Sequence, residues 1–200
     1  MSVFDEIADG YDDDLFHQVV AEKLVISVAD APSPGLVLDV ATGTGAAAFA
    51  ALQHLGAREV VAIDLSAKMI DRARAKAVLQ DPFSKITWQV GPAVPAPVPA
   101  ASADLVVCAS ALHFLGAAAL QDWLRVLRPG GRLAFSVPLA TTFNPSPAFA
   151  ALVAADIPLP CCVAQAAAIA EVAGYRKVVA RELETLGKRV VFLVYATAPG

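Results

Sequence analysis

A glycine loop and a later acidic residue form the pattern in this sequence that is best suited to hold a small molecule. Gly43 and Gly45 lie between a short apolar run and a run of helical composition. Glycine lets a ligand approach the backbone closely, and the helix that follows presents unpaired N–H groups at its start. Asp64 ends the next apolar run, 19 residues after Gly45, about where α/β nucleotide-binding folds place the acid that accepts hydrogen bonds from ribose hydroxyls. Together they predict a nucleoside ligand; the alternative is that the glycines make only a tight turn and Asp64 only caps the helix that starts at Ala67.

A second acid precedes the loop and bears on which nucleoside is bound. Asp39 lies inside the strand that leads into the loop, and Ala48 stands where a dinucleotide fingerprint has its third glycine. A carboxylate repels a pyrophosphate but attracts the ammonium group of an amino acid. The pattern therefore favours S-adenosylmethionine over a nicotinamide dinucleotide.

Apolar, β-branched runs alternate with runs of helical composition along most of the chain. The predicted strands cover residues 36–40, 59–64, 85–90, 104–109, 131–137, 178–183 and 189–197, and the predicted helices cover 46–55, 67–79, 116–127 and 165–173. Such alternation predicts parallel strands joined by crossover helices, which is an α/β fold. The last two strands must be antiparallel, because the turn Leu186-Gly187-Lys188 is too short for a crossover. Ser66 is predicted as a helix N-cap and Gly56 as a helix stop.

Length and composition indicate a single domain over residues 1–200 and exclude several classes of function. A formal net charge of −4 offers no basic surface for nucleic acid. Mean hydropathy is high at +0.59, but no apolar stretch reaches the ~18 residues of a membrane span. The three cysteines match no metal-ligand or disulfide spacing, and the acidic N-terminus is unlike a signal peptide. We therefore expect a cytoplasmic protein without a metal site.

These motifs, in this order, resemble the class I S-adenosylmethionine-dependent methyltransferases over nearly the whole chain. The segments that carry the resemblance are 4–12, 37–45, 60–66, 103–113 and 127–133. The most similar branch is that of small-molecule methyltransferases, which includes quinone-biosynthesis enzymes. The resemblance implies a Rossmann-like methyltransferase fold, in which a seven-stranded, mostly parallel sheet has an antiparallel last strand and helices on both faces.

The resemblance also implies a set of cofactor-binding residues. These are Tyr11, Asp39, Ala41, Gly43, Gly45, Asp64, Leu65, Met69, Ala93 and Ser110. Tyr11 is expected to lie over the cofactor and Met69 to pack on adenine. Two positions depart from the family pattern: Ala41 replaces the first loop glycine, and Pro92 replaces an acid that bonds the adenine amine. Because proline has neither a carboxylate nor an N–H, that contact is either lost or made by the Ala93 backbone.

His113 is the candidate general base, since it follows the fourth predicted strand at the edge where ligands of such folds bind. Methyl transfer needs a base only when the acceptor must lose a proton. The alternative for His113 is a residue at a helix start, packed beneath the lid. His17 is a second candidate, whereas the helix dipole alone explains His54.

Two segments that fall outside the alternation of predicted strands and helices are expected to form the acceptor pocket. They are an N-terminal helical lid (1–30) and a proline-rich acceptor loop (138–162), and their candidate substrate residues are Phe4, Phe16, His17, Phe143 and Asn144. Their apolar character indicates an aromatic or lipophilic acceptor, although an amphipathic helix docked on the body, or a loop packed on Trp123, would look the same. The predicted function is methyl transfer from S-adenosylmethionine to a small organic acceptor, with a homodimer possible. The alternatives are a relative that catalyses a rearrangement, decarboxylation or cyclisation, and a non-catalytic partner subunit.

Overall fold

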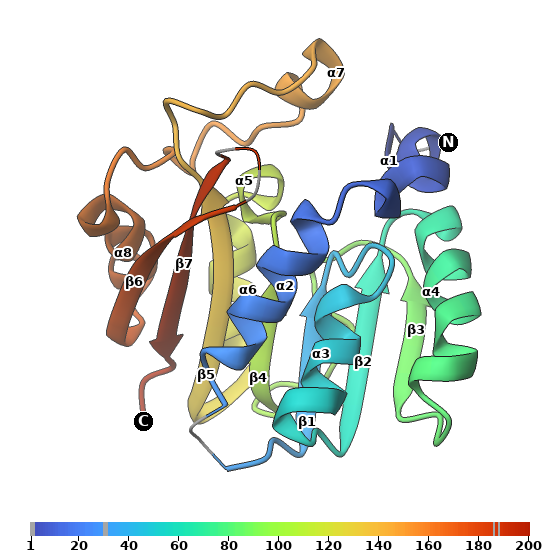
Figure 1. Cartoon of the computed structure of the whole chain (residues 1–200). Helices are drawn as coiled ribbons and strands as arrows, with labels where there is room; N and C mark the ends of the chain where they lie inside the picture. The colour runs from blue at the N-terminus through green and yellow to red at the C-terminus, as the bar shows by residue number, and fades with distance from the viewer. Residues whose placement is uncertain (1–2, 30–31, 186, 188) are drawn as a thin grey trace.

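A seven-stranded sheet forms the centre of the computed structural model, which describes residues 3–29, 32–185, 187 and 189–200 (Figure 1). Its strands are β1 (Leu36–Val40), β2 (Glu59–Asp64), β3 (Ile86–Val90), β4 (Ala103–Cys108), β5 (Leu127–Pro138), β6 (Arg176–Glu184) and β7 (Val190–Thr197), in the order β3-β2-β1-β4-β5-β7-β6. The pairs among β1 to β5 are parallel. Only β7 runs against its neighbours, β5 and β6. The predicted sheet, mostly parallel with an antiparallel last strand, is confirmed.

Helices cover both faces of this sheet, as predicted (Figure 1). They are α1 (Val3–Ile7), the 3-10 helix η1 (Ala8–Asp13), α2 (Phe16–Ile26), α3 (Ala46–Leu55), α4 (Ala67–Gln80), α5 (Leu112–Leu115), α6 (Ala117–Val126), α7 (Pro147–Ala150) and α8 (Val163–Val172). Residues of α2 and α3 belong to one apolar core, and residues of α6 and α8 belong to the core on the other face. Among the described residues, no helix combines the length and the apolar character needed to cross a membrane.

The central strands are apolar along their whole length because both of their faces are covered. In β4, Val106 enters one core while Leu105 and Val107 enter the other, as expected when successive side chains point to opposite faces. All three side chains are fully buried. The ends of β1 and β4 are therefore held from both sides, which gives the loops that follow them a rigid base.

Several element boundaries differ from the prediction by a few residues. The largest difference is at β5, which starts at Leu127 rather than at residue 131. Leu127 has extended backbone angles (φ −67°, ψ 136°), so the predicted helix 116–127 ends at Val126. The predicted cap is confirmed at Ser66, whose hydroxyl accepts a hydrogen bond from the Met69 N–H, and the predicted stop at Gly56 is confirmed by its left-handed φ of 61°.

The proline-rich segment expected as the acceptor loop (138–162) begins at Pro138, the last residue of β5, and contains the short helix α7. The segment between β3 and β4 runs without a helix. In the predicted turn between β6 and β7, Leu186 and Lys188 lie outside the described residues. The strands on either side of that turn pair in antiparallel fashion.

Candidate active site

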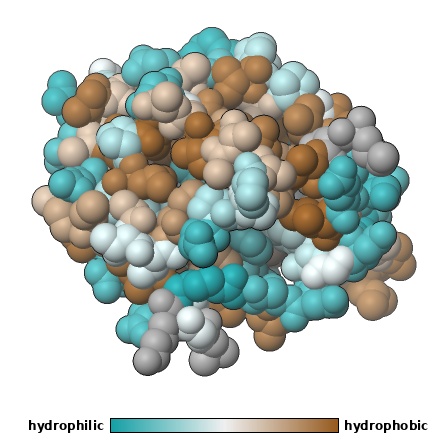
Figure 2. Space-filling model, turned by 90° about the horizontal axis from the view of Figure 1, so that it is seen from above, coloured by the Kyte–Doolittle hydropathy of each residue, from teal (hydrophilic) through white to brown (hydrophobic). Residues whose placement is uncertain are grey.

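A cavity of about 840 Å³ lies at the carboxyl edge of the parallel strands. Its walls come from the loops after β1, β2, β3 and β4, from the end of β5, from the N-terminal segment and from residues 142–152. Figure 2 looks down on this edge and shows apolar patches interspersed with hydrophilic ones. A volume of this size lies within the ~300–1,000 Å³ range of small-molecule sites.

Asp64 joins the glycine loop to the start of α4. Its Oδ2 accepts a hydrogen bond from the Gly43 N–H (2.8 Å) and its Oδ1 accepts one from the Ser66 N–H (2.8 Å). The side chain lines the cavity although the residue is only 7 % exposed, and burial is the main cause that raises its pKa. A carboxylate has about four lone-pair sites, so Asp64 can still accept hydrogen bonds from a ligand. The cap of α4 is Ser66, so capping by Asp64 does not account for its position.

The three small residues of the loop have different surroundings. Ala41 and Gly43 both line the cavity and both have left-handed backbones, with φ of 53° and 57°. Gly45 is also left-handed (φ 91°), but a Cβ there would lie 2.7 Å from the Trp88 ring and 2.8 Å from the Phe49 ring. Packing against these rings therefore requires glycine at 45. Gly45 is outside the cavity lining, and its part in cofactor binding stays a prediction.

Asp39 is also outside the lining of the main cavity. It is buried beneath the loop, where the Thr42 hydroxyl donates to its Oδ2 (2.5 Å), and burial raises its pKa to about 7. It borders a smaller cavity of about 290 Å³, which shares Tyr11, His17 and Ala41 with the larger one. The predicted contact of Asp39 with an amino-acid group would therefore be made from this second cavity.

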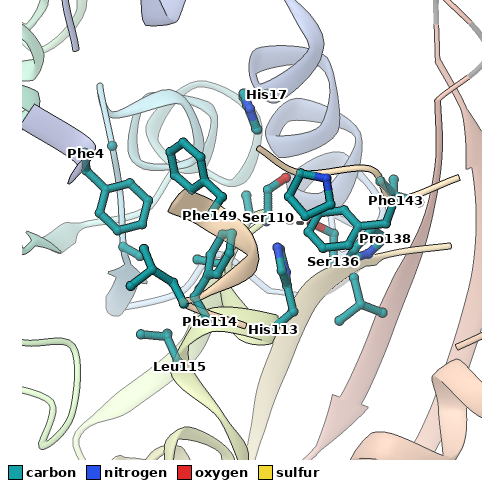
Figure 3. A pocket seen from close by; sticks show the side chains of 18 of the residues that line it. Phe4, His17, Ser110, His113, Phe114, Leu115, Ser136, Pro138, Phe143 and Phe149 are labelled. Carbon is teal, nitrogen blue, oxygen red and sulfur yellow. Dashed lines mark hydrogen bonds between the residues drawn. The ribbon is translucent and has the colours of Figure 1, made fainter. Parts of the chain in front are cut away.

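Two imidazoles line the main cavity from different walls (Figure 3). His113, on α5, is 4 % exposed, and His17 belongs to α2. Burial lowers the pKa of each to about 4, so both rings are neutral at pH 7. The Nδ1 atoms of both rings are buried and have no hydrogen-bond partner in the described part of the chain. Each ring can therefore accept a proton or a hydrogen bond from a ligand.

Ser110 lies beside His113 and has an unusual backbone for a serine (φ 61°). Its N–H donates to the Ser136 hydroxyl (2.8 Å) at the end of β5. The Ser110 Oγ is buried without a partner among the described residues, and both serines line the cavity. The site thus contains unpaired polar atoms that a polar ligand would satisfy, as buried groups require.

Comparison with known proteins identifies the family. A family model described as a methyltransferase domain matches residues 37–131. The chain is 36 % identical over 140 residues to the demethylmenaquinone methyltransferase of Deinococcus radiodurans, a match that covers 66 % of this chain and 56 % of that protein. It is 33 % identical over 139 residues to the ubiquinone/menaquinone biosynthesis C-methyltransferase UbiE of Dinoroseobacter shibae, covering 66 % and 55 % of the two. The chain belongs to the class I S-adenosylmethionine-dependent methyltransferases.

Solved structures of methyltransferases share the fold over nearly the whole chain. A S-adenosylmethionine-dependent methyltransferase from Aquifex aeolicus has a TM-score of 0.71 at 24 % identity and covers 96 % of this chain and 97 % of its own. A chain from the complex between the Haloferax volcanii Trm112 methyltransferase activator and a methyltransferase has a TM-score of 0.75 at 19 % identity, covering 100 % and 99 %. At these identities the likeness concerns the fold. The chain spans about half the length of the curated relatives that it matches.

The predicted cofactor of the family, S-adenosylmethionine, fits the residues present. Asp64 offers free lone pairs, and the left-handed loop at Ala41 and Gly43 lines the cavity between Asp64 and Tyr11. The apolar wall beyond Asp64 contains Leu65, Met69, Pro92, Ala93 and Val94. Pro92, which departs from the family pattern, thus belongs to this wall and adds no polar side-chain group to it.

All five candidate substrate residues line the same cavity as eight of the ten candidate cofactor residues. The Phe4 ring lies 5.5 Å from that of Phe149 and 6.0 Å from that of Phe114, measured between centroids. Phe143 meets His113 edge to face at 5.1 Å. Figure 3 shows Phe4, Phe114 and Phe149 gathered on one side of His113 and Phe143 on the other. The segments that contain these rings therefore meet over the site instead of packing on Trp123.

Sequence reasoning missed some of the residues that line the cavity. Phe114 and Ser136 line the cavity without having been predicted, and so does Arg189. Phe114 follows His113 directly, and that adjacency was an available signal. Nothing local marks Arg189, which reaches the site only because β7 lies beside β5.

The acidic run at residues 12–14 takes part in ion pairs with other elements of the fold. Asp12 forms an ion pair with Lys76 (2.8 Å). Asp14 forms one with Arg189 (2.6 Å), whose guanidinium lies 4.0 Å from the centroid of the Phe16 ring. Charged pairs therefore fix the N-terminal segment over the cavity.

Proposed function

We propose that this chain transfers the methyl group of S-adenosylmethionine to a small, lipophilic aromatic acceptor that carries a hydroxyl group. The observation that carries the proposal is a single cavity with the Asp64 carboxylate in one wall and phenylalanine rings in another. The names of the curated relatives, which are quinone-biosynthesis methyltransferases, support an acceptor of this kind. Because the chain spans about half of their length, their substrates count here as support alone.

Several residues would hold the cofactor. Asp64 would accept hydrogen bonds from the ribose hydroxyls, each contributing about 1.5–3 kcal/mol because the acceptor is charged. The exposed backbone at Ala41 and Gly43 would face the amino-acid part, with Tyr11 above it. Leu65 and Met69 would pack against the adenine ring. When bound, the cofactor supplies a methyl group activated by a positively charged sulfonium.

The acceptor end would orient the ring and receive its proton. Phenylalanine rings favour aromatic ligands through edge-to-face contacts of about 0.5–1.5 kcal/mol. His113 would accept the hydroxyl proton through its unpaired nitrogen and so raise the electron density of the acceptor. Its burial keeps it neutral at pH 7, so it does not repel the sulfonium. Alignment of donor and acceptor would supply much of the remaining rate, since well-oriented groups gain about 7–11 kcal/mol.

We further propose that the two segments outside the regular core define the acceptor. The N-terminal segment supplies Phe4, Phe16 and His17 to the cavity, and residues 142–152 supply Phe143 and Asn144. A change in either segment would then alter the acceptor while leaving the sheet intact.

The test is a transfer assay with methyl-labelled S-adenosylmethionine and matched acceptors. The acceptors are a bicyclic hydroquinone, its dimethyl ether and an aliphatic amine of similar size. We expect the label to pass to the hydroquinone, and not to the ether, in which no hydroxyl can be deprotonated, nor to the amine. The ether also controls for simple apolar partitioning into the cavity.

Two results would contradict the proposal. An acceptor that is converted while the label stays on the cofactor would indicate a rearrangement, decarboxylation or cyclisation. An absence of heat on titration with S-adenosylmethionine or its demethylated product would indicate a non-catalytic scaffold.

A further inference from the structure

Polar contacts act together with the ring contacts of Phe4 to hold the N-terminal segment over the cavity. Helix α1 contains no buried residue, and within η1 only Ala8 is buried. The Asp5 carboxylate accepts a hydrogen bond from the Ser66 hydroxyl (2.6 Å). Asp12 and Asp14 make the ion pairs described above. Loss of these polar partners would therefore let the segment open more easily.

Lys76 is at the centre of these contacts. From the third turn of α4, its Nζ lies 2.8 Å from Oδ2 of Asp12 and 2.9 Å from the hydroxyl of Thr44. The Thr44 hydroxyl in turn donates to Oδ1 of Asp12 (2.7 Å). The three side chains form a closed triangle that connects η1, the glycine loop and α4.

The triangle is partly buried, so its contacts are stronger than those of an ordinary ion pair at the surface. Thr44 is 2 % exposed, and the side chains of Lys76 and Asp12 are about one-third exposed (32 % and 29 %). Although burial acts to raise the pKa of Asp12, the bonds from Lys76 and Thr44 hold it below its usual value. Arg72, one turn earlier on α4, faces Asp12 only at 3.7 Å and Asp9 at 3.8 Å. Lys76 is therefore the cation that fixes Asp12.

Fixing Asp12 also fixes its neighbour Tyr11, which borders both cavities. The Tyr11 ring stacks on His17 at 4.8 Å between centroids, and its Cε1 lies 3.6 Å from where a Cβ of Gly43 would be. Tyr11 thus covers the part of the loop that a cofactor must pass to enter or leave. Movement of Tyr11 requires the Asp12 contacts to move or break.

We propose that Lys76 is a positioning residue for the cofactor: by bridging Asp12 and Thr44 it holds Tyr11 closed over the glycine loop and so slows cofactor release. This inference rests on the proposed function for the identity of the ligand. Lys76 does not line the main cavity, although it borders the smaller cavity that Asp39 also borders. Its effect should therefore appear in dissociation and in lid movement, and not in the transfer step itself.

The test compares three variants of the full chain with the wild type. Lys76→Met removes the charge at similar length, Lys76→Arg restores it, and Arg74→Met is the matched control. Arg74 belongs to the same helix, but its ion pair is with Asp71 one turn earlier (3.5 Å) and its side chain is 52 % exposed. The measurements are the dissociation rate of S-adenosylhomocysteine and, without any ligand, the hydrogen exchange of amides 3–14.

We expect Lys76→Met to raise the dissociation rate about tenfold, the effect of losing one charged hydrogen bond. Exchange of amides 3–14 should accelerate in parallel. Lys76→Arg should recover most of both losses, and Arg74→Met should match the wild type. Melting temperatures of all four proteins will show whether the variants are folded.

Wild-type rates and wild-type exchange in Lys76→Met would overturn the inference, as would an equal effect in Arg74→Met. The experiment also distinguishes a failure of the proposed function from a failure of the role of Lys76. If the wild type binds no S-adenosylhomocysteine, the proposed function is wrong, and the exchange experiment still decides whether Lys76 closes the segment.

Discussion

The two ends of the cavity are built in different ways. At the cofactor end, Asp64 and the glycine loop sit at the ends of β2 and β1, and two backbone N–H groups fix the Asp64 carboxylate. At the acceptor end, Phe4 comes from α1, Phe114 from α5 and Phe149 from α7. These three elements are short and lie outside the sheet. One end is thus fixed by the core of the fold, and the other is assembled from peripheral segments.

This difference indicates which properties can change independently. The geometry at Asp64 cannot change without disturbing buried strands. A phenylalanine in α7, in contrast, can be substituted without affecting β1 or β2. Cofactor affinity and acceptor preference should therefore be separable by mutation. Each of the following experiments tests that separation at one position.

The largest effect is expected at the cofactor end. Asp64→Asn replaces one acceptor oxygen with an NH₂ group, which would face the Gly43 or Ser66 N–H. We expect the Kd for S-adenosylmethionine to rise roughly 300-fold, equivalent to about two charged hydrogen bonds. The control is Asp71→Asn, an exposed position on α4. Calorimetry measures both, and an unchanged Kd in Asp64→Asn would remove the ribose assignment.

His113 lies where the two ends meet, and its removal should affect the rate alone. His113→Gln keeps a polar side chain but loses the base, so kcat should fall about 100-fold, at the low end of general-base effects. The Kd for the cofactor should stay unchanged. His54→Gln, on α3 and paired with Glu22 (3.3 Å), serves as the control. Full turnover of a hydroxylated acceptor by His113→Gln would show that His113 has a packing role and is not the base.

The pH dependence of stability tests whether His113 is buried in neutral form. Its pKa is about 4 in the folded chain, below the ~6.5 of an unfolded chain. Between these values the unfolded state binds more protons, so stability falls as pH falls. Between pH 7 and pH 5 the wild type should lose about 2 kcal/mol more than His113→Gln. Denaturant unfolding of both proteins measures this difference. The titrations of Asp39 and His17 occur in both proteins and therefore cancel. Equal losses of stability in the two proteins would show that His113 is solvated.

At the acceptor end, a single ring should change acceptor binding alone. Phe143→Ala removes the ring beside His113 and should raise the acceptor KM about tenfold, within the ~1–3 kcal/mol of a buried apolar group. The Kd for S-adenosylmethionine should not change. Phe83→Ala is the matched control, because Phe83 is 82 % exposed and is outside the cavity lining. A parallel rise in both constants for Phe143→Ala would mean that the ends are coupled.

The same difference explains how far the sequence could predict the site. The strands, the loop and Asp64 follow from local patterns, because burial on both faces and a strand-to-helix turn leave a regular signature. The cluster of Phe4, Phe114 and Phe149 depends on how α1, α5 and α7 pack together. The periodicity of apolar residues in the sequence does not predict that packing. The triangle around Lys76 was also missed, since Asp12, Thr44 and Lys76 are 32 residues apart at each step. Asp39 and Gly45 show the reverse case, because both are expected at the ligand from the sequence and neither lines the main cavity.

The smallest effect is expected at Ala41, where the cofactor end departs from its family pattern. Ala41 has a left-handed backbone (φ 53°), which costs a non-glycine residue roughly 1–2 kcal/mol. Ala41→Gly removes that strain, and the greater freedom of glycine in the unfolded chain offsets part of the gain, so a net stabilisation of about 0.5 kcal/mol is expected. Removal of the Cβ should also lower the Kd for S-adenosylmethionine about twofold, because the ligand can approach the backbone more closely.

Ala101→Gly separates these two effects. Ala101 has nearly the same φ (52°) but is exposed in the loop before β4, so its substitution relieves the same strain far from the ligand. Both variants should gain similar stability by denaturant unfolding, and only Ala41→Gly should bind the cofactor more tightly. If Ala101→Gly tightened binding equally, the gain would come from overall rigidity, and the backbone of the loop would not be the surface that the cofactor approaches.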